Sequence, residues 1–375
     1  MIQDKEQGRR YFQVRRGLPN IARKLAGVDP IVIAFIGGSI TEGYGASEPD
    51  ETSWRALTGS YLKKRYPQGT VSCINAGVGG TTSTFGAHRM AEHVMANGEI
   101  DLLFVEFSVN DGVDRKESIR GVEGIVRQCR RLSPHADICL VYTAADKNLS
   151  VESPFNIAVH EEVASHYELP SLNLAAGIRA LIQKGEIRWE ELAPDLVHPN
   201  DAGYAQYAMY VQAFLEEVLA QPVTSTVSSL TIPKPLIVRN YEFGAMLDVS
   251  HVEQQKGFKI TDVKLEPLIN WRYDLKHLYT DKPDAQFSFI ASGRSTGLLL
   301  LCGPDTGIFE YSLDGLTFHE VNLFDEWCLG AYRPIIAVFP LQPDVVRTRV
   351  IIRNTTQKDN RSTGTCLRVL KLLSS

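Results

Sequence analysis

The first 220 residues alternate short apolar runs with longer segments in which apolar side chains recur every three or four positions. The short runs have the length of strands, and the longer segments fit amphipathic helices, as in Ser53–Tyr66 and Glu117–Leu132. Ser153 followed by Pro154 is typical of a helix start, so we expect a helix from there to about Tyr167. Five strands joined by helices predict a doubly wound parallel α/β sheet. The predicted strands are Ile31–Ile36, Val71–Asn75, Leu102–Ser108, Ile138–Thr143 and Ser171–Leu174.

The pattern changes after residue 220. Residues 221–229 are small and polar, as in an exposed linker. From residue 230 to residue 375, strand-length runs follow one another with few helical segments, which predicts an all-β sandwich of the jelly-roll type. Within it, Asp314 and Gly315 tolerate positive φ angles and predict a tight hairpin turn. We therefore expect an α/β domain at 1–220, a linker at 221–229 and a β domain at 230–375.

Composition and charge exclude several classes of protein. Hydrophobic residues make up 44% and charged residues 22% of the 375, as in an ordinary globular protein with a sizeable core. Because 39 basic residues face 44 acidic ones and no Lys/Arg block occurs, we expect no nucleic-acid partner. The segment 1–6 lacks the apolar region of a secretory signal, and no apolar run is long enough to span a membrane. We expect a cytoplasmic protein with no membrane partner.

The cysteines and histidines predict neither a disulfide framework nor a metal site. Six cysteines are scattered without a Cys-x-x-Cys pair, which favours a reduced compartment and unpaired, buried or half-buried thiols. His160-Glu161 is followed by His166 rather than by a histidine at the spacing that places two ligands on one helical face. We therefore expect no zinc and no organic cofactor.

Candidate chemistry begins where the first predicted strand ends. The strand Ile31–Ile36 leads into Gly37-Gly38-Ser39, and ligands of a doubly wound sheet collect at the carboxyl ends of its strands. Two glycines remove the Cβ atoms that would hinder a tight turn before an exposed serine nucleophile. An ordinary Gly-Gly-Ser loop explains the same three residues.

The next two strands also end in candidate residues. After the second strand, Gly77, Gly79 and Gly80 resemble a dinucleotide-binding loop, but the third glycine of that fingerprint would fall at Thr82. A backbone-lined anion site remains open there. After the third strand, Asn110 is suited either to donate its amide to an oxyanion or to cap a turn.

A histidine and an aspartate precede the last helix of the α/β region. His198 lies three residues after Asp195, close enough for the carboxylate to fix the imidazole tautomer that takes a proton from serine. Asn200 or Asp201 supplies the N-cap of the helix that follows. The pair gains weight from its position, because this loop and the strand ends face the same edge of the sheet.

Taken in order, Gly37-Gly38-Ser39, Gly80, Ser108-Val109-Asn110-Asp111 and Asp195-Leu196-Val197-His198 resemble the four sequence blocks of the SGNH (GDSL-like) hydrolases. The resemblance covers roughly residues 30 to 220 and implies a flavodoxin-like sheet and a Ser, His, Asp triad.

The resemblance also implies a role for each matched residue. Ser39 would be the nucleophile, His198 the general base and Asp195 the residue that orients it. The oxyanion hole would be formed by the backbone N–H groups of Ser39 and Gly80 and by the side chain of Asn110. Two positions depart from the family pattern: Gly38 replaces the usual aspartate before the nucleophile, and Ser108 replaces a glycine two positions before the asparagine.

The β region contains a competing motif and several aromatic residues. Gly293-Arg294-Ser295-Thr296-Gly297 matches the Gly-x-Ser-x-Gly nucleophile elbow, but it leads into a strand instead of a helix, so we interpret it as a hairpin loop. Large aromatics of a sandwich usually belong to its core, although stacking on a sugar ring is the alternative. Asp325-Glu326-Trp327 is the segment that most resembles a saccharide contact. The other aromatics considered are Trp271, Tyr273 and Phe324.

We expect a serine esterase that hydrolyses short-chain O-acyl esters through an acyl-enzyme. The substrate that the family resemblance favours is an acetyl ester of a soluble carbohydrate. A lipid or thioester acylhydrolase of the same fold is one alternative. A non-catalytic carbohydrate-binding protein, inactive because of Gly38 and Ser108, is another. The β domain would serve as a second surface for the sugar or as a dimerisation module in a homo-oligomer.

Overall fold

The chain forms two compact units, Met1–Glu242 and Phe243–Ser375, in the computed structural model, which describes residues 11–150, 153–220 and 232–375. The linker predicted at 221–229 lies outside the described residues. The first unit extends beyond the expected boundary at 230, because residues 233–242 hydrogen-bond to the α/β domain: Glu123 accepts the backbone N–H groups of Leu236 and Ile237. Arg127 adds bonds to the carbonyl of Pro233 and to Glu242.

The first unit contains a six-stranded sheet in the order β1-β6-β5-β4-β2-β3. The strands β2 to β6 are parallel and follow the flavodoxin-like order, which confirms the predicted α/β fold. The edge strand β1 pairs antiparallel with β6 and was not predicted, because two residues are too short to show a periodicity. The strands are β1 (Phe12–Gln13), β2 (Ile31–Gly37), β3 (Val71–Gly77), β4 (Leu102–Glu106), β5 (Asp137–Tyr142) and β6 (Ser171–Asn173).

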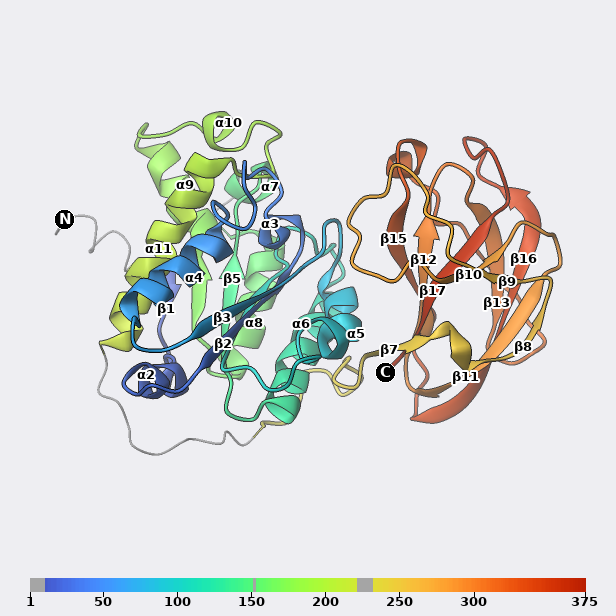
Figure 1. Cartoon of the computed structure of the whole chain (residues 1–375), viewed down its shortest axis with the longest axis horizontal. Helices are drawn as coiled ribbons and strands as arrows, with labels where there is room; N and C mark the ends of the chain where they lie inside the picture. The colour runs from blue at the N-terminus through green and yellow to red at the C-terminus, as the bar shows by residue number, and fades with distance from the viewer. Residues whose placement is uncertain (1–10, 151–152, 221–231) are drawn as a thin grey trace. The chain divides into compact units, whose positions relative to one another are not determined.

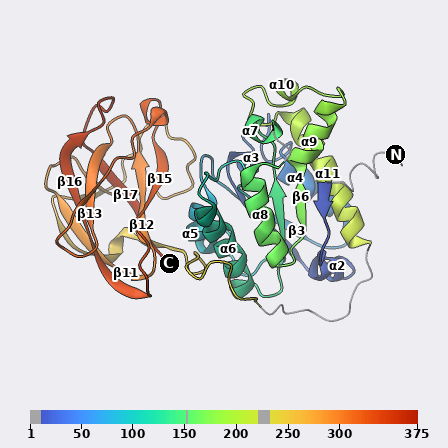
Figure 2. The same cartoon turned by 180° about the vertical axis from the view of Figure 1, so that it is seen from behind.

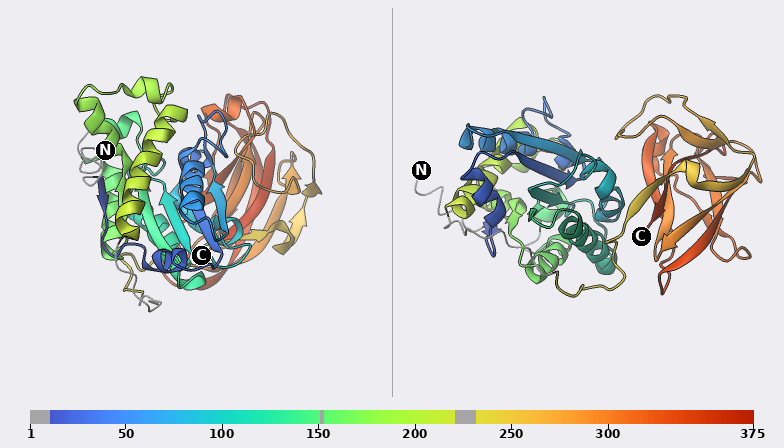
Figure 3. Two further views of the ribbon diagram at one scale, coloured as in Figure 1. Left: turned by 60° about the vertical axis from the view of Figure 1, so that its left-hand side comes forward. Right: turned by 60° about the horizontal axis from the view of Figure 1, so that its bottom comes forward.

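Helices cover both faces of this sheet (Figures 1 and 2). Helices α5, α6 and α8 pack together on one face, and α4 lies beside α11 on the other, as the left view of Figure 3 shows. The predicted start of α8 was wrong by one residue: Pro154 is the N-cap and Ser153 lies outside the helix. The helices are α2 (Pro19–Leu25), α3 (Ser39–Glu42), α4 (Trp54–Arg65), α5 (Ser83–His93), α6 (Arg115–Leu132), α7 (Asp146–Leu149), α8 (Phe155–His166), α9 (Leu174–Gln183), α10 (Trp189–Leu192) and α11 (Asp201–Leu219).

The second unit is a sandwich of two antiparallel sheets, as expected. One sheet has the order β15-β12-β17-β10-β9, with β7 also paired to β17, and the other has the order β14-β13-β16-β11-β8. A core of apolar side chains fills the space between them. The strands are β7 (Ala245–Asp248), β8 (Val252–Lys256), β9 (Lys259–Thr261), β10 (His277–Thr280), β11 (Gln286–Gly293), β12 (Thr296–Cys302), β13 (Gly307–Ser312), β14 (His319–Val321), β15 (Arg333–Val338), β16 (Val346–Lys358) and β17 (Leu367–Ser374); η3 spans Glu326–Leu329.

The turn predicted at Asp314 and Gly315 joins β13 to β14, but it is longer than the tight turn expected. Gly315 has a φ of +76°, and Asp314 accepts the N–H groups of Leu316 and Thr317, which widens the loop. The six cysteines are all unpaired. Cys73 is exposed, contrary to the prediction of buried or half-buried thiols, because it lies on β3 at the edge of the sheet.

The sheet order places the site. In the sheet, β3 lies on one side of β2 and β4 lies on the other, so the strand order reverses between β2 and β4. In doubly wound folds, ligands bind at the carboxyl ends of the strands at such a switch point. In Figure 1, α3, α7 and α10 lie along this carboxyl edge, while α2 lies at the opposite edge. No helix of the described residues has the length and apolar character needed to cross a membrane.

Candidate active site

Ser39 is the first residue of α3 and follows β2 with only Gly38 between them. The two preceding glycines are packed too closely for a side chain. A Cβ at Gly37 would lie 2.6 Å from the carbonyl oxygen of Glu106, and a Cβ at Gly38 would lie 2.2 Å from Oδ1 of Asn110. The turn therefore brings Ser39 directly beside the end of the neighbouring strand β4.

Ser39, His198 and Asp195 form a continuous chain of hydrogen bonds. Ser39 Oγ lies 2.7 Å from Nε2 of His198, and Nδ1 of the same ring lies 2.6 Å from Oδ2 of Asp195. The other carboxylate oxygen of Asp195 accepts the backbone N–H groups of Val197 and His198 at 3.0 and 2.7 Å. The three residues singled out from the sequence are thus in the geometry of a proton relay to a serine.

The electrostatics of the aspartate suit that geometry. Burial raises the pKa of the Asp195 carboxyl, but the hydrogen bonds from His198 and Val197 and the charge of the His198 ring outweigh it, so the pKa is lowered overall. The carboxylate consequently stays ionised at neutral pH and accepts from Nδ1, which leaves Nε2 to face the serine.

The loop that follows α3 brings an aromatic ring to the histidine. Tyr44 packs edge-on against the ring of His198 with 4.6 Å between centroids, and 61% of its surface is exposed. The buried Tyr204 hydroxyl holds the backbone carbonyl of Tyr44 at 2.7 Å, and Asp201 holds the backbone N–H of Ser47. As expected, an N-cap from this region opens α11: it is Asn200, which accepts the N–H of Gly203.

The two other residues predicted to form an oxyanion hole lie in adjacent loops. The side chain of Asn110 lies against Gly38, the residue before the nucleophile, and its backbone closes a turn onto the carbonyl of Phe107. Gly80 has a φ of +68°, and the N–H of its neighbour Gly79 is bound by Glu42 of α3 at 2.7 Å. Asn110 thus lies in a turn beside the residue that precedes the nucleophile, and its role as an oxyanion donor stays a prediction.

The structure explains one of the two departures from the family pattern. Any side chain at position 38 would occupy the space of the Asn110 amide, so glycine is the residue that this arrangement requires. Ser108 is fully buried, and its hydroxyl has no hydrogen-bond partner among the described residues. Nothing in the structure explains the choice of serine there.

Two buried acidic residues beside the site were missed at the sequence level. Glu106, the last residue of β4, accepts hydrogen bonds from Thr41 of α3 and Thr143 after β5 at 2.9 and 2.8 Å. Burial raises the pKa of Glu106, although hydrogen bonds from Thr143, Thr41 and the Gly38 backbone partly offset this rise. Asp111 pairs with His160 at 2.9 Å. For Glu106 the signal in the sequence was a charged residue inside an apolar strand, and Asp111 was noted only as part of the block around Asn110.

The competing Gly-x-Ser-x-Gly motif around Ser295 does not form a nucleophile elbow. Ser295 lies between β11 and β12, which belong to different sheets, so the segment is a crossing between sheets and the hairpin interpretation was wrong. Its backbone pairs with Ser375, and its side chain is buried. Asp314 and His319 follow Ser295 in the chain order of a hydrolase triad. Asp314, however, accepts the N–H groups of its own turn, and His319 is exposed and packs on Tyr311.

The aromatic candidates of the β region differ in how far their side chains are exposed to solvent. Tyr273 and Phe324 are buried in the β unit, whereas Trp327 of η3 is 64% exposed.

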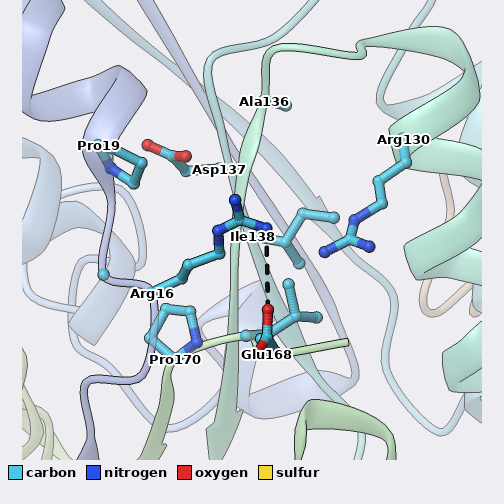
Figure 4. A pocket seen from close by; sticks show the side chains of 10 residues that line it. Arg16, Pro19, Arg130, Ala136, Asp137, Ile138, Glu168 and Pro170 are labelled. Carbon is cyan, nitrogen blue, oxygen red and sulfur yellow. Dashed lines mark ion pairs between the residues drawn. The ribbon is translucent and has the colours of Figure 1, made fainter. Parts of the chain in front are cut away.

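At the opposite edge of the α/β sheet from Ser39, Arg16, Arg130 and Asp137 line a small pocket, in which an ion pair joins Arg16 to Glu168 (Figure 4). The described residues contain no group of three side chains suited to hold a metal ion.

Comparison with known proteins identifies the first unit. Residues 35–206 match the model of the GDSL-like lipase/acylhydrolase family. Over these residues the α/β unit is similar to this family. This match, together with the solved two-domain esterases described next, supports a carboxylic ester hydrolase with an additional β domain. No curated protein matches the chain.

Solved structures show how far the similarity extends. A two-domain esterase active on acetylated mannans has a TM-score of 0.82 and 24% identity, over 97% of this chain and 95% of that one. The same kind of esterase co-crystallised with mannopentaose has a TM-score of 0.80 and 25% identity, over 95% and 93%. An acetylxylan esterase from Geobacillus stearothermophilus covers 52% of this chain and 97% of its own, with 21% identity and a TM-score of 0.43.

Proposed function

We propose that the protein is a serine esterase that removes short acyl groups, acetyl above all, from carbohydrate esters through an acyl-enzyme on Ser39. The observation that carries this proposal is the hydrogen-bonded chain from Ser39 through His198 to Asp195 at the carboxyl edge of the sheet. The similarity over both domains to an esterase active on acetylated mannans supports the carbohydrate substrate.

In the first half-reaction, Ser39 Oγ attacks the acyl carbonyl carbon while His198 Nε2 accepts the serine proton. Asp195 holds Nδ1–H and stabilises the imidazolium that forms. The carbonyl oxygen becomes an oxyanion, bound by the N–H groups of Ser39 and Gly80 and by the Asn110 amide. Collapse of this intermediate breaks the ester bond, and His198 donates the proton to the departing sugar oxygen.

In the second half-reaction, water replaces the sugar. His198 takes a proton from the water molecule, whose oxygen attacks the acyl-serine carbonyl to form a second oxyanion in the same hole. Collapse breaks the bond to Ser39 Oγ, the proton returns to the serine, and the free carboxylic acid leaves. Apart from the ester and one water molecule, these steps use side chains and backbone groups of the chain.

The proposal is tested with Ser39→Ala and its matched control Ser295→Ala. We expect Ser39→Ala to lose several orders of magnitude in turnover of p-nitrophenyl acetate and to resist labelling by an organophosphate, while Ser295→Ala keeps both. Equal losses in the two variants would refute the site.

The substrate is tested separately, by measuring acetate release from acetylated manno- and xylo-oligosaccharides and by comparing p-nitrophenyl esters of increasing chain length. A preference for acyl chains of eight or more carbons, or no release from any sugar ester, would contradict the carbohydrate acetylesterase and favour the lipid or thioester alternative.

A further inference from the structure

Asp111, the residue after Asn110, takes no part in the proton relay and yet is almost completely buried, with 2% of its side chain exposed. Its two carboxylate oxygens accept three hydrogen bonds. Oδ1 accepts the backbone N–H of Ser83 at 2.8 Å, and Oδ2 accepts the Ser83 hydroxyl at 2.7 Å. Oδ2 also contacts Nε2 of His160 at 2.9 Å, and that ring is 3% exposed. A buried carboxylate with all its partners in place has a fixed position.

The partners of Asp111 belong to the elements that surround the predicted oxyanion hole. Ser83 is the first residue of α5 and lies three positions after Gly80. His160 lies on α8, and Asn156, one helical turn earlier, binds the backbone carbonyl of Asp111. Asp111 therefore joins the loop that carries Asn110 to the loop that carries Gly80, and anchors both to α8.

We propose that Asp111, held by His160, is a positioning residue that fixes the Asn110 amide relative to the Gly80 backbone, so that both donors meet the oxyanion of one intermediate. The inference rests on the proposed function. Donors of an oxyanion hole act only when they are already in place, and a displacement of about 1 Å costs on the order of 100-fold in rate. Neither Asp111 nor His160 contacts the substrate carbonyl in this scheme.

The test compares Asp111→Ala with Asn110→Ala and with the double variant, using p-nitrophenyl acetate. We expect Asp111→Ala to lower kcat on the order of 100-fold with KM changed less than about threefold. Because Asp111 acts through the oxyanion donors, the loss in the double variant should be at least about tenfold smaller than the product of the two single losses. Losses that multiply would mean that Asp111 acts independently, and would overturn the inference.

Asp137→Ala is the matched control. Asp137 is also a buried aspartate that accepts a backbone N–H, that of Ile21, but it is the first residue of β5 and so lies at the amino-terminal edge of the sheet, opposite Ser39. We expect this variant to change stability and to leave kcat within about twofold. A similar fall in kcat for both variants would assign the effect to general destabilisation and refute the positioning role.

A second pair of variants keeps the test decisive if Asp111→Ala does not fold. His160→Gln retains an N–H donor for Asp111, whereas His160→Ala does not. We expect kcat within about threefold of the wild type for His160→Gln and a loss of about tenfold or more for His160→Ala; equal rates would overturn the inference. If Ser39→Ala keeps its turnover, the proposed function itself fails. If Ser39→Ala is inactive and Asp111→Ala keeps its kcat, only this inference fails.

Discussion

Replacing Gly38 by alanine tests whether the departure from the family pattern is part of the working site. The added Cβ would lie 2.2 Å from Oδ1, 2.7 Å from Cγ and 3.0 Å from Nδ2 of Asn110. Contacts this short between non-bonded atoms do not occur, so one side must move. Residue 38 is the N-cap of α3 with a φ of −86°, which alanine adopts without strain, and the obstructing atoms are the end of a side chain. We expect the amide of Asn110 to rotate away while the fold persists.

The substitution should therefore lower the catalytic rate rather than the stability of the fold. Loss of one oxyanion donor is worth about 2.7 to 4 kcal/mol, so kcat for p-nitrophenyl acetate should fall by roughly 10²- to 10³-fold. KM should change little, because the donor acts on the transition state. The melting temperature should stay within a few degrees of the wild type.

Two controls distinguish displacement of the Asn110 amide from other effects of the added methyl group. Gly112→Ala adds the same methyl group two residues after Asn110, where no atom lies within 4 Å, and should leave kcat unchanged. In an Asn110→Ala background the space beside position 38 is free, so Gly38→Ala should add little further loss. A Gly38→Ala enzyme with wild-type kcat, or one whose loss persists fully in the Asn110→Ala background, would refute the reasoning.

Three further outcomes follow from individual contacts. Asp195→Asn should lower kcat by about 10⁴-fold at pH 7 with the fold retained. The lowered pKa of Asp195 keeps its carboxylate an acceptor for His198, whereas an amide favours the wrong tautomer of the ring. An unchanged rate would remove the aspartate from the mechanism. Burial raises the pKa of Asp137 to about 7, above its value of 3.8 when exposed, so its stabilising contribution is complete below about pH 4 and is lost as the pH rises to about 7. The free energy of unfolding of Asp137→Asn relative to the wild type should consequently rise by about 2 to 3 kcal/mol between pH 5 and pH 8 in urea titrations, and a constant difference would contradict this. Glu123→Gln should lower the free energy of unfolding by about 1.5 to 3 kcal/mol and increase proteolysis within 232–242, because the buried carboxylate accepts the N–H groups of Leu236 and Ile237; unchanged cleavage would show that these bonds do not hold the segment.

Short-range periodicity was sufficient for the parallel strands β2 to β6, and the residue types at their ends indicated the main candidates. The strands β2 to β6 begin and end within two residues of their predicted positions, because apolar runs and the turns that bound them are local features. The pair Asp195 and His198 could be predicted for the same reason, since His198 lies three positions after Asp195 in one loop. The order of the strands then places Ser39 and Asn110 at one edge of the sheet.

Contacts between distant segments were decided only by the tertiary structure. Ser39 and His198 are 159 positions apart, and Asp111 and His160 are 49 apart, so no local pattern indicates either contact. In the sequence Gly38 was only a departure from the family pattern, and the packing of Asn110 against it shows that a side chain does not fit there. Local preferences specify which segments are helix or strand, whereas the fit of buried polar groups depends on which segments meet, and that is a property of the folded chain.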